Sequence, residues 1–305
     1  MMVEALLLTV ITAATPLLLA AIGELVAERS GVLNLGVEGM MVVGAVAAFA
    51  ASQSTGSTYV GILAAVLAGS AMALLFAILA VWMATNQVAT GLALTLFGLG
   101  VSGLVGESFV GLPGLRLAPI EIPLLSDIPF IGEALFGQDI LFYASIALTI
   151  GVSWFLFRTR AGLRLRAVGD APVAAHAIGI NVLLTRTLAV VFGGACAGLA
   201  GAQLTLVYTP QWIENISAER GWIALALVVF ASWRPARLVV GAYLFGAVTN
   251  LQFQAQGLGI PVASQFLSAL PYVATIVVLV VIASNRRFTM INTPAALGQP
   301  FVPDR

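Results

Sequence analysis

Long apolar stretches recur along this chain, and their length is the feature that most restricts its fold. Crossing the hydrocarbon core of a bilayer takes roughly 20 mostly apolar residues in a helix. Hydrophobic residues make up 60% of the sequence and charged residues only 9%. Because backbone in lipid must satisfy its own hydrogen bonds, we predict an all-α, polytopic transmembrane helix bundle. The candidate segments are 5–26, 37–52, 59–84, 88–110, 140–157, 187–208, 221–233, 238–256 and 269–284.

These segments predict eight to ten helices, with nine favoured, in one transmembrane domain over residues 1–305. Segments 37–52 and 221–233 are short for a full crossing, so we expect them to be tilted, broken or only partly spanning. The longest connection on one side, at about 111–139, contains four prolines and cannot be a membrane segment. It is either a solvated connector or a contact for an external partner.

The 13 Lys and Arg residues are all arginines, and they are distributed unevenly. If the nine segments alternate, only Arg116 and Arg220 fall on the side that carries most of the acidic residues. Basic loop residues mark the cytoplasmic side of membrane proteins. We therefore predict that the 158–186 loop and the C-terminus lie in the cytoplasm. The eleven arginines on that side are Arg29, Arg158, Arg160, Arg164, Arg166, Arg186, Arg234, Arg237, Arg286, Arg287 and Arg305.

Several classes of function are disfavoured by composition. A net charge of zero argues against a nucleic-acid-binding protein, which would carry a basic surface. Without lysine there is no Gly-Lys-[Ser/Thr] phosphate loop, so any ATP and Mg must be bound by a partner subunit. Cys196 and His176 are the only residues of their types, which leaves no multi-cysteine metal site. We expect no catalytic residue, no metal and no cofactor in this chain.

The first unusual motif lies between the first two apolar segments. It holds three carboxylates, Glu24, Glu28 and Glu38, together with Arg29 and Asn34. Glycines in the same stretch suit an irregular backbone, as found where helices break around a transport path. Ionisable groups at membrane depth are costly and therefore indicate function. The alternative is a cytoplasmic turn with ordinary interfacial charges.

A second motif begins with the basic residues that include Arg164 and Arg166. A short helix is predicted after them, because Asp170 is a suitable cap, Pro172 fits the first turn and Gly179 fits the end of the helix.

This helix is too short to be stable alone in water, so it must pack on something. A groove on a partner protein is one candidate, and the surface of its own bundle is the alternative. Its lone histidine, His176, is expected at the helix surface. The predicted apolar face consists of Val173, Ala174, Ala177 and Ile178.

The third motif is a polar stripe in the segment 238–256. Thr249, Gln252 and Gln256 share one face, and other amides lie on another face. Amides in hydrocarbon must find partners, and neutral donors and acceptors suit an uncharged, hydrogen-bonding solute. Contacts between helices are the alternative use of these side chains.

Taken in order, these motifs resemble the permease subunits of ATP-binding-cassette importers in the branched-chain amino acid, ribose and nucleoside superfamily. The similarity covers roughly residues 20–285 and is greatest to the nucleoside branch that works with basic-membrane-protein-type lipoproteins. The matching stretches are ERSGVLNLGVEGMM (28–41), GLRLRAVG (162–169), AA (174–175), GINV (179–182), AGLAGA (197–202), GWIALAL (221–227) and LPY (270–272).

The resemblance implies a permease half in a bacterial-type inner or plasma membrane. It would pair with a second permease subunit, as a homodimer or heterodimer, and receive solute from an extracytoplasmic lipoprotein. Cytoplasmic ATPase subunits would contact residues 171–179 and drive alternating access, most simply for a nucleoside. The implied coupling residues are Arg164, Arg166, Asp170, Pro172, Ala174, Ala175 and Gly179.

For the solute path, we expect Asn34, Glu38, Gln252 and Gln256 to contribute. A permease for a simple sugar or a branched-chain amino acid remains open as an alternative. So do an ATP-independent secondary transporter and a purely structural membrane subunit.

Overall fold

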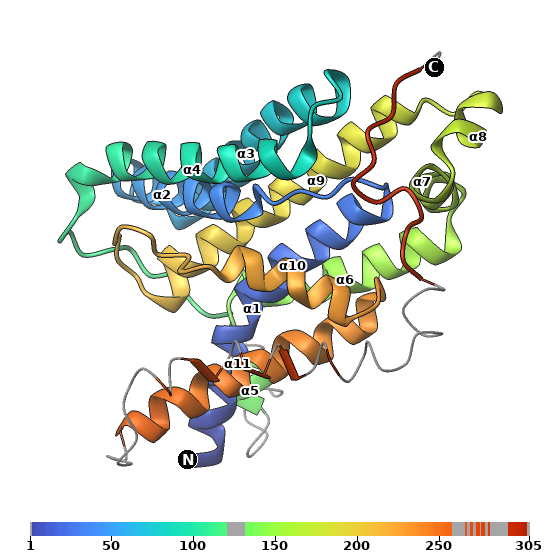
Figure 1. The fold of residues 1–305 in the computed structure, drawn as a ribbon. Helices are drawn as coiled ribbons and strands as arrows, with labels where there is room; N and C mark the ends of the chain where they lie inside the picture. The colour runs from blue at the N-terminus through green and yellow to red at the C-terminus, as the bar shows by residue number, and fades with distance from the viewer. Residues whose placement is uncertain are drawn as a thin grey trace.

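The computed structural model describes residues 2–120, 132–257 and 292–303, with a few helical positions between 266 and 280. Helices form nearly all the regular structure of these residues (Figure 1). The predicted all-α bundle is confirmed.

The helices follow one another in chain order, and α3 and α9 each continue into a short π-helical turn. The elements are α1 (Met2–Arg29), α2 (Val37–Thr55), α3 (Thr58–Ala77), η1 (Ile78–Trp82), α4 (Gln87–Gly106), η2 (Glu107–Phe109), α5 (Gly132–Phe136), α6 (Ile140–Arg158), α7 (Arg160–Asp170), α8 (Pro172–Ala177), α9 (Val182–Gln203), η3 (Leu204–Tyr208), α10 (Arg220–Phe230) and α11 (Pro235–Gly257). Several of the helices begin at side-chain caps, in which a polar oxygen accepts from the first turn. The caps are Asn86, Asp139, Thr159 and Asn181.

Within the described residues, six helical stretches are long and apolar enough to cross a membrane. They are α1, α2, α3 with η1, α4 with η2, α6, and α9 with η3. The helix predicted at 221–233 is α10, whose 11 residues span about 16 Å, half a bilayer core. The helix predicted at 37–52 is longer than expected, because α2 continues to Thr55. The predicted segment 269–284 lies largely outside the described residues.

Helices α1, α2, α3 and α9 form the packed centre of the bundle. Small residues lie where these helices cross, which lets the backbones approach closely. A methyl carbon placed on Gly44 of α2 would lie 2.6 Å from Gly198 Cα of α9. Cys196 of α9 is buried in the same layer, as expected for a small apolar side chain.

Helices α7 and α8 lie at one end of the bundle, beside residues 292–303, which we call the C-terminal segment (Figure 1). Two backbone hydrogen bonds fix this segment: Ala296 N donates to Gly169 O at 2.9 Å, and Gly298 N donates to Gly31 O at 3.1 Å. Arginines from four parts of the chain meet here, and we call this region the arginine end. It carries Arg29, Arg158, Arg160, Arg164, Arg166, Arg186 and Arg234.

Candidate functional site

Two helices begin inside the bundle after irregular segments. Helix α2 follows residues 30–36, and α10 follows residues 209–219. Non-helical backbone is tolerated at membrane depth only where protein buries it or where it lines water. The irregular backbone predicted in the first motif is therefore present. The second break, before α10, agrees with the expectation that segment 221–233 is broken or only partly spanning.

A single carboxylate joins the first turns of these two helices. Glu38 of α2 is 3% exposed, and its Oε1 accepts hydrogen bonds from Ser217 Oγ and, at 3.0 Å, from Glu219 N. Its Oε2 accepts from Gly221 N at 2.6 Å. Glu38 therefore satisfies the amides that α10 leaves open at its N-terminus. Gly221 is needed because any Cβ would lie 2.6 Å from Glu38 Cα.

The Glu38 junction lies at half the height of the bundle. The neighbouring Gly39 packs against α4, where a methyl carbon placed on it would lie 2.7 Å from Leu94 O. Gly98 of α4 also packs against Gly39, because a methyl carbon placed on Gly98 would lie 2.7 Å from Gly39 Cα. Because α4 runs from Gln87 to Gly106, both contacts are close to its midpoint.

The first break is held by polar groups within the chain. Asn34 is 1% exposed, and its Oδ1 accepts from Gly36 N at 3.0 Å in an Asx-type turn. The Asn34 backbone N–H donates to Glu24 Oε1 at 3.1 Å. Thr95 Oγ1 of α4 donates to Leu35 O at 3.0 Å. The buried carboxylate of Glu24 thus holds the extended chain that leads to α2.

The second break follows α4 from its end toward its middle. Trp212 packs its indole against Gly106, where only a hydrogen leaves room for the ring. Glu214 Oε1 lies 3.8 Å from a methyl position on Gly103, one turn further along α4. The side of the membrane predicted for Arg220 stays a prediction, but Arg220 is the first residue of α10 rather than part of a loop. The second break brings Arg220 to the Glu38 junction at half the height of the bundle. If every segment crossed the membrane completely, Arg220 would lie at one end of the bundle instead.

At the arginine end, Trp233 ties α1 to the turn after α10. Its indole Nε1 donates to Glu28 Oε2 at 2.6 Å. Its carbonyl accepts from Arg29 Nη2 at 2.9 Å. The guanidinium groups of Arg29 and Arg166 lie 6.0 and 5.3 Å from the centroid of the Phe157 ring. Glu28 and Arg29, adjacent in sequence, are thus both used in packing the ends of α1, α6, α7 and α10.

The predicted short helix is α8, and two of its three boundary signals are confirmed. Pro172 is in the first turn of α8. Gly179 has a φ of +85°, a left-handed conformation that ends the helix, and its N–H donates to His176 O at 2.9 Å. Asp170 does not cap α8: it is the last residue of α7, and Ala171 occupies the cap position without a side-chain hydrogen bond. The basic leader is itself helical, so Asp170 belongs to that helix.

The apolar face predicted for α8 is open on the surface of this chain. Val173 is 68% exposed and Ile178 is 77% exposed, and Ala174 between them is also exposed. Ala175 points the other way and is buried at 3%. In α7, Arg164 is exposed, whereas Arg166 is half-buried against the Phe157 ring.

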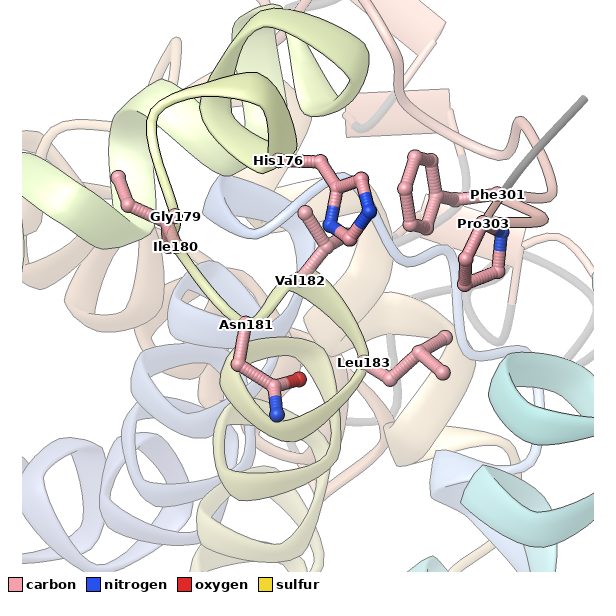
Figure 2. A pocket seen from close by; sticks show the side chains of 8 residues that line it. All are labelled: His176, Gly179, Ile180, Asn181, Val182, Leu183, Phe301 and Pro303. Atoms are coloured by element: carbon pink, nitrogen blue, oxygen red, sulfur yellow. The ribbon is translucent and has the colours of Figure 1, made fainter.

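A pocket of about 320 Å³ lies between the end of α8, the start of α9 and the C-terminal segment. Figure 2 shows His176 and Phe301 facing each other across it, with Pro303 beside Phe301. The two rings meet edge to face with centroids 5.6 Å apart. Phe301 is 7% exposed and belongs to a small apolar cluster with Val168, Ala175 and Val182. His176 is a surface residue of α8, as predicted.

Arg186 connects this region to the first break. Its Nε donates to Ser30 O at 3.2 Å and its Nη1 to Gln299 O at 2.9 Å. The side chain is 1% exposed. Neither the burial of Arg186 nor its pairing with the C-terminal segment was predicted, because a tail rich in proline carries no packing pattern.

The four expected solute-path residues lie in two separate places. Asn34 and Glu38 belong to the first break at half height. Gln252 is half-buried near the far end of α11, a helix that packs on α1, α6 and α10. The neighbouring Asn250 hydrogen-bonds Thr9 near the start of α1. The side chain of Gln256 lies outside the described part of the chain.

Comparison with known proteins gives this arrangement a family. Residues 6–283 match the family model described as "Branched-chain amino acid transport system / permease component". The "Putative glucose ABC transporter permease protein TsgC13" of Haloferax volcanii is 41% identical over 95% of both chains. The guanosine ABC transporter permease protein NupQ of Bacillus subtilis is 30% identical over 95% of this chain and 93% of its own.

The nucleoside ABC transporter permease protein NupC of Lactococcus lactis is 32% identical over 87% of this chain and 88% of its own. The chain therefore belongs to the branched-chain amino acid transport permease family and is a multi-pass membrane transport subunit rather than an enzyme.

Proposed function

We propose that this family member is the membrane-spanning half of an ATP-driven importer, with its arginine end in the cytoplasm. It would pair with a second permease subunit and receive solute from a binding protein on the opposite side. The orientation follows from the collection of arginines at one end, which is the pattern of cytoplasmic loops.

The observation that carries the proposal is the open face of α8. Val173 and Ile178 are apolar, largely exposed and located at the arginine end, where no hydrocarbon would cover them. An ATPase subunit in the cytoplasm would bury them, and α8 would then pass the movement of the ATPase to the helices. Helix α8 is joined to the packed centre through Ala175, Val182 and Phe301. The solute path would open to each side in turn, which is alternating access.

For the solute, we propose a nucleoside. NupQ and NupC, which carry the names of nucleoside permeases, support this choice over most of the chain. A sugar is the second candidate, because the relative from Haloferax volcanii is named for glucose and is 41% identical. Both solutes are uncharged and rich in hydroxyl groups.

Purification of the chain with its ATPase and permease neighbours tests the proposal. In liposomes that hold the complex and its binding protein, guanosine, adenosine and uridine are expected to stimulate ATP hydrolysis, whereas leucine is not. Stimulation by glucose alone would replace the nucleoside with a sugar. If the chain purifies without an ATPase and transports solute in the absence of ATP, the importer assignment is wrong.

A further inference from the structure

The second break carries a group of exposed polar side chains. Glu214, Asn215 and Glu219 are all exposed on the surface of this chain, although the segment that holds them enters the bundle. Trp212, Ile216 and Ser217 are buried, whereas Ile213 and Ala218 are exposed beside the polar side chains. The polar side chains therefore form a surface, which we call the 213–219 surface.

The position of this surface is fixed by contacts along α4. Glu214 lies beside Gly103, three residues from the end of α4. The Glu219 N–H bonds to Glu38, whose neighbour Gly39 packs on Gly98. Between Gly106 and Gly98 the helix rises about 12 Å, at 1.5 Å per residue. The 213–219 surface thus descends from near the end of α4 to the middle of the membrane-crossing part.

Hydrocarbon is a poor environment for such a surface. A carboxylate at the centre of a bilayer costs at least about 2.5 kcal/mol, and exposed irregular backbone has no hydrogen-bond partners in lipid. The outward face of α4 at similar heights is entirely different in character. Leu96 is 71% exposed and Leu104 is 76% exposed, as expected of side chains that contact lipid tails. The outward face of α4 is therefore suited to lipid, whereas the neighbouring 213–219 surface is suited to water or protein.

We propose that the 213–219 surface lines a water-filled path between this chain and the second permease subunit, where Glu214 and Asn215 bind hydroxyl groups of the solute. This inference rests on the proposed function and names the part of the chain that meets the solute.

The chemistry of the surface restricts the solute. The Glu214 carboxylate accepts hydrogen bonds from hydroxyl groups, and the Asn215 amide both donates and accepts. The nearby cation Arg220 is already engaged: its guanidinium lies 4.9 Å from the centroid of the Tyr208 ring and donates to Ser217 O at 3.2 Å. The α10 amides that could bind an anion are occupied by Glu38. The surface thus favours a neutral, hydroxyl-rich solute over an anion.

Thiol labelling in native membranes tests the path, because charged methanethiosulfonates react with thiols in water and not with thiols in lipid. The native Cys196 is buried, so the unmodified chain supplies the background. Asn215→Cys and Glu214→Cys are both compared with Leu104→Cys, because Leu104 follows Gly103 on α4 and Glu214 lies beside Gly103. Glu214→Cys also guards against misfolding of Asn215→Cys, because Asn215 has a φ of +55° whereas Glu214 does not have a positive φ.

At least tenfold faster labelling is expected at Asn215 and Glu214 than at Leu104. Guanosine or glucose, added with the binding protein, is expected to slow labelling at Asn215 severalfold. Equal and slow labelling at all three positions would overturn the water-filled path. Fast labelling that neither solute slows would overturn the solute contact. The labelling assay needs no ATP hydrolysis, so it tests the water-filled path separately from the importer proposal. Slow labelling would contradict the path even if an ATPase co-purifies with the chain. Transport without an ATPase would contradict the importer proposal even if the path is labelled.

Discussion

At the scale of single residues, the interior is organised by charged side chains that have been given partners inside the chain. Glu38 accepts hydrogen bonds from three groups of the segment 217–221. Glu24 accepts one from the nearby Asn34, and Glu28 accepts one from the distant Trp233. Charge in the membrane part is tolerated because it replaces water at helix ends that would otherwise be open. The three buried glutamates of the first motif are thus structural acceptors.

The substitution Glu38→Gln is expected to destabilise the junction of α2 and α10. A glutamine keeps one acceptor oxygen and places an NH2 group against the other donors, which leaves at least one buried donor without a partner. The expected loss is about 1–3 kcal/mol in the free energy of unfolding. It is measured as a lower Tm of the purified protein in detergent. Glu107→Gln, at an exposed residue just beyond α4, is the control. Equal melting of the two variants would show that Glu38 is not a structural acceptor.

Glycines at the crossing of α2 and α4 allow a matched comparison on one helix. A methyl group at Gly98 would lie 2.7 Å from Gly39 Cα, whereas one at Gly100 has nothing within 4 Å. Gly98→Ala is expected to cost about 1–3 kcal/mol, because two backbones must separate. Gly100→Ala should be neutral or gain up to about 1 kcal/mol from helix propensity. Thermal melting of both variants is the measurement, and a Gly98→Ala that melts like wild type would contradict the close crossing.

At the scale of elements, the sequence predicts those helices whose boundaries are set locally. Pro172 and Gly179 mark the two ends of α8. The fixed φ of proline and the positive φ that glycine allows are properties of single residues, so they can be recognised in the sequence. The start of α10 carries no such signal, because its cap is Glu38, about 180 positions earlier in the chain. The prediction for Asp170 is wrong for a related reason: a good cap residue is also acceptable at the end of α7. Pairings across the bundle, such as Arg186 with Gln299, are equally absent from local patterns.

Helix α8 is expected to bind the ATPase through its exposed apolar side chains. Ile178→Asp and Val173→Asp should each weaken association with the ATPase at least tenfold, which is about 1.4 kcal/mol. The melting temperature of the isolated permease should not change, because both side chains are exposed. The measurement is the amount of ATPase that co-purifies at increasing salt. Val302→Asp, at a 42%-exposed apolar residue of the same end, is the control. Loss of the ATPase in all three variants would argue against a specific role for α8.

At the scale of the whole molecule, the chain has a rigid centre and two regions where segments from distant parts meet. One is the half-height junction, where the two breaks share Glu38. The other is the arginine end, where the C-terminal segment crosses from Gly169 to Gly31 and on to Arg186. The C-terminal segment therefore contacts both α8, through the side chain of Phe301, and the chain leading into α2, through the Gly298–Gly31 hydrogen bond. The charge pattern of this end and the limits of α8 were evident in the sequence, whereas the contacts of the C-terminal segment were not, since they depend on the closed fold.

Phe301 is the residue through which this connection can be loosened. Its ring is 7% exposed and packs with Val168, Ala175 and Val182, whereas its neighbour Val302 is 42% exposed. Phe301→Ala should leave the transmembrane bundle intact but free α8, because the ring is the main apolar contact between α8 and the C-terminal segment. Hydrogen exchange of the amides of α8 is expected to become at least tenfold faster, and exchange in α1 and α9 to stay unchanged. Val302→Ala is the matched control and should change neither. If α8 exchanges at the wild-type rate in Phe301→Ala, then α8 is held by α7 and α9 alone, and the C-terminal segment does not connect it to the first break.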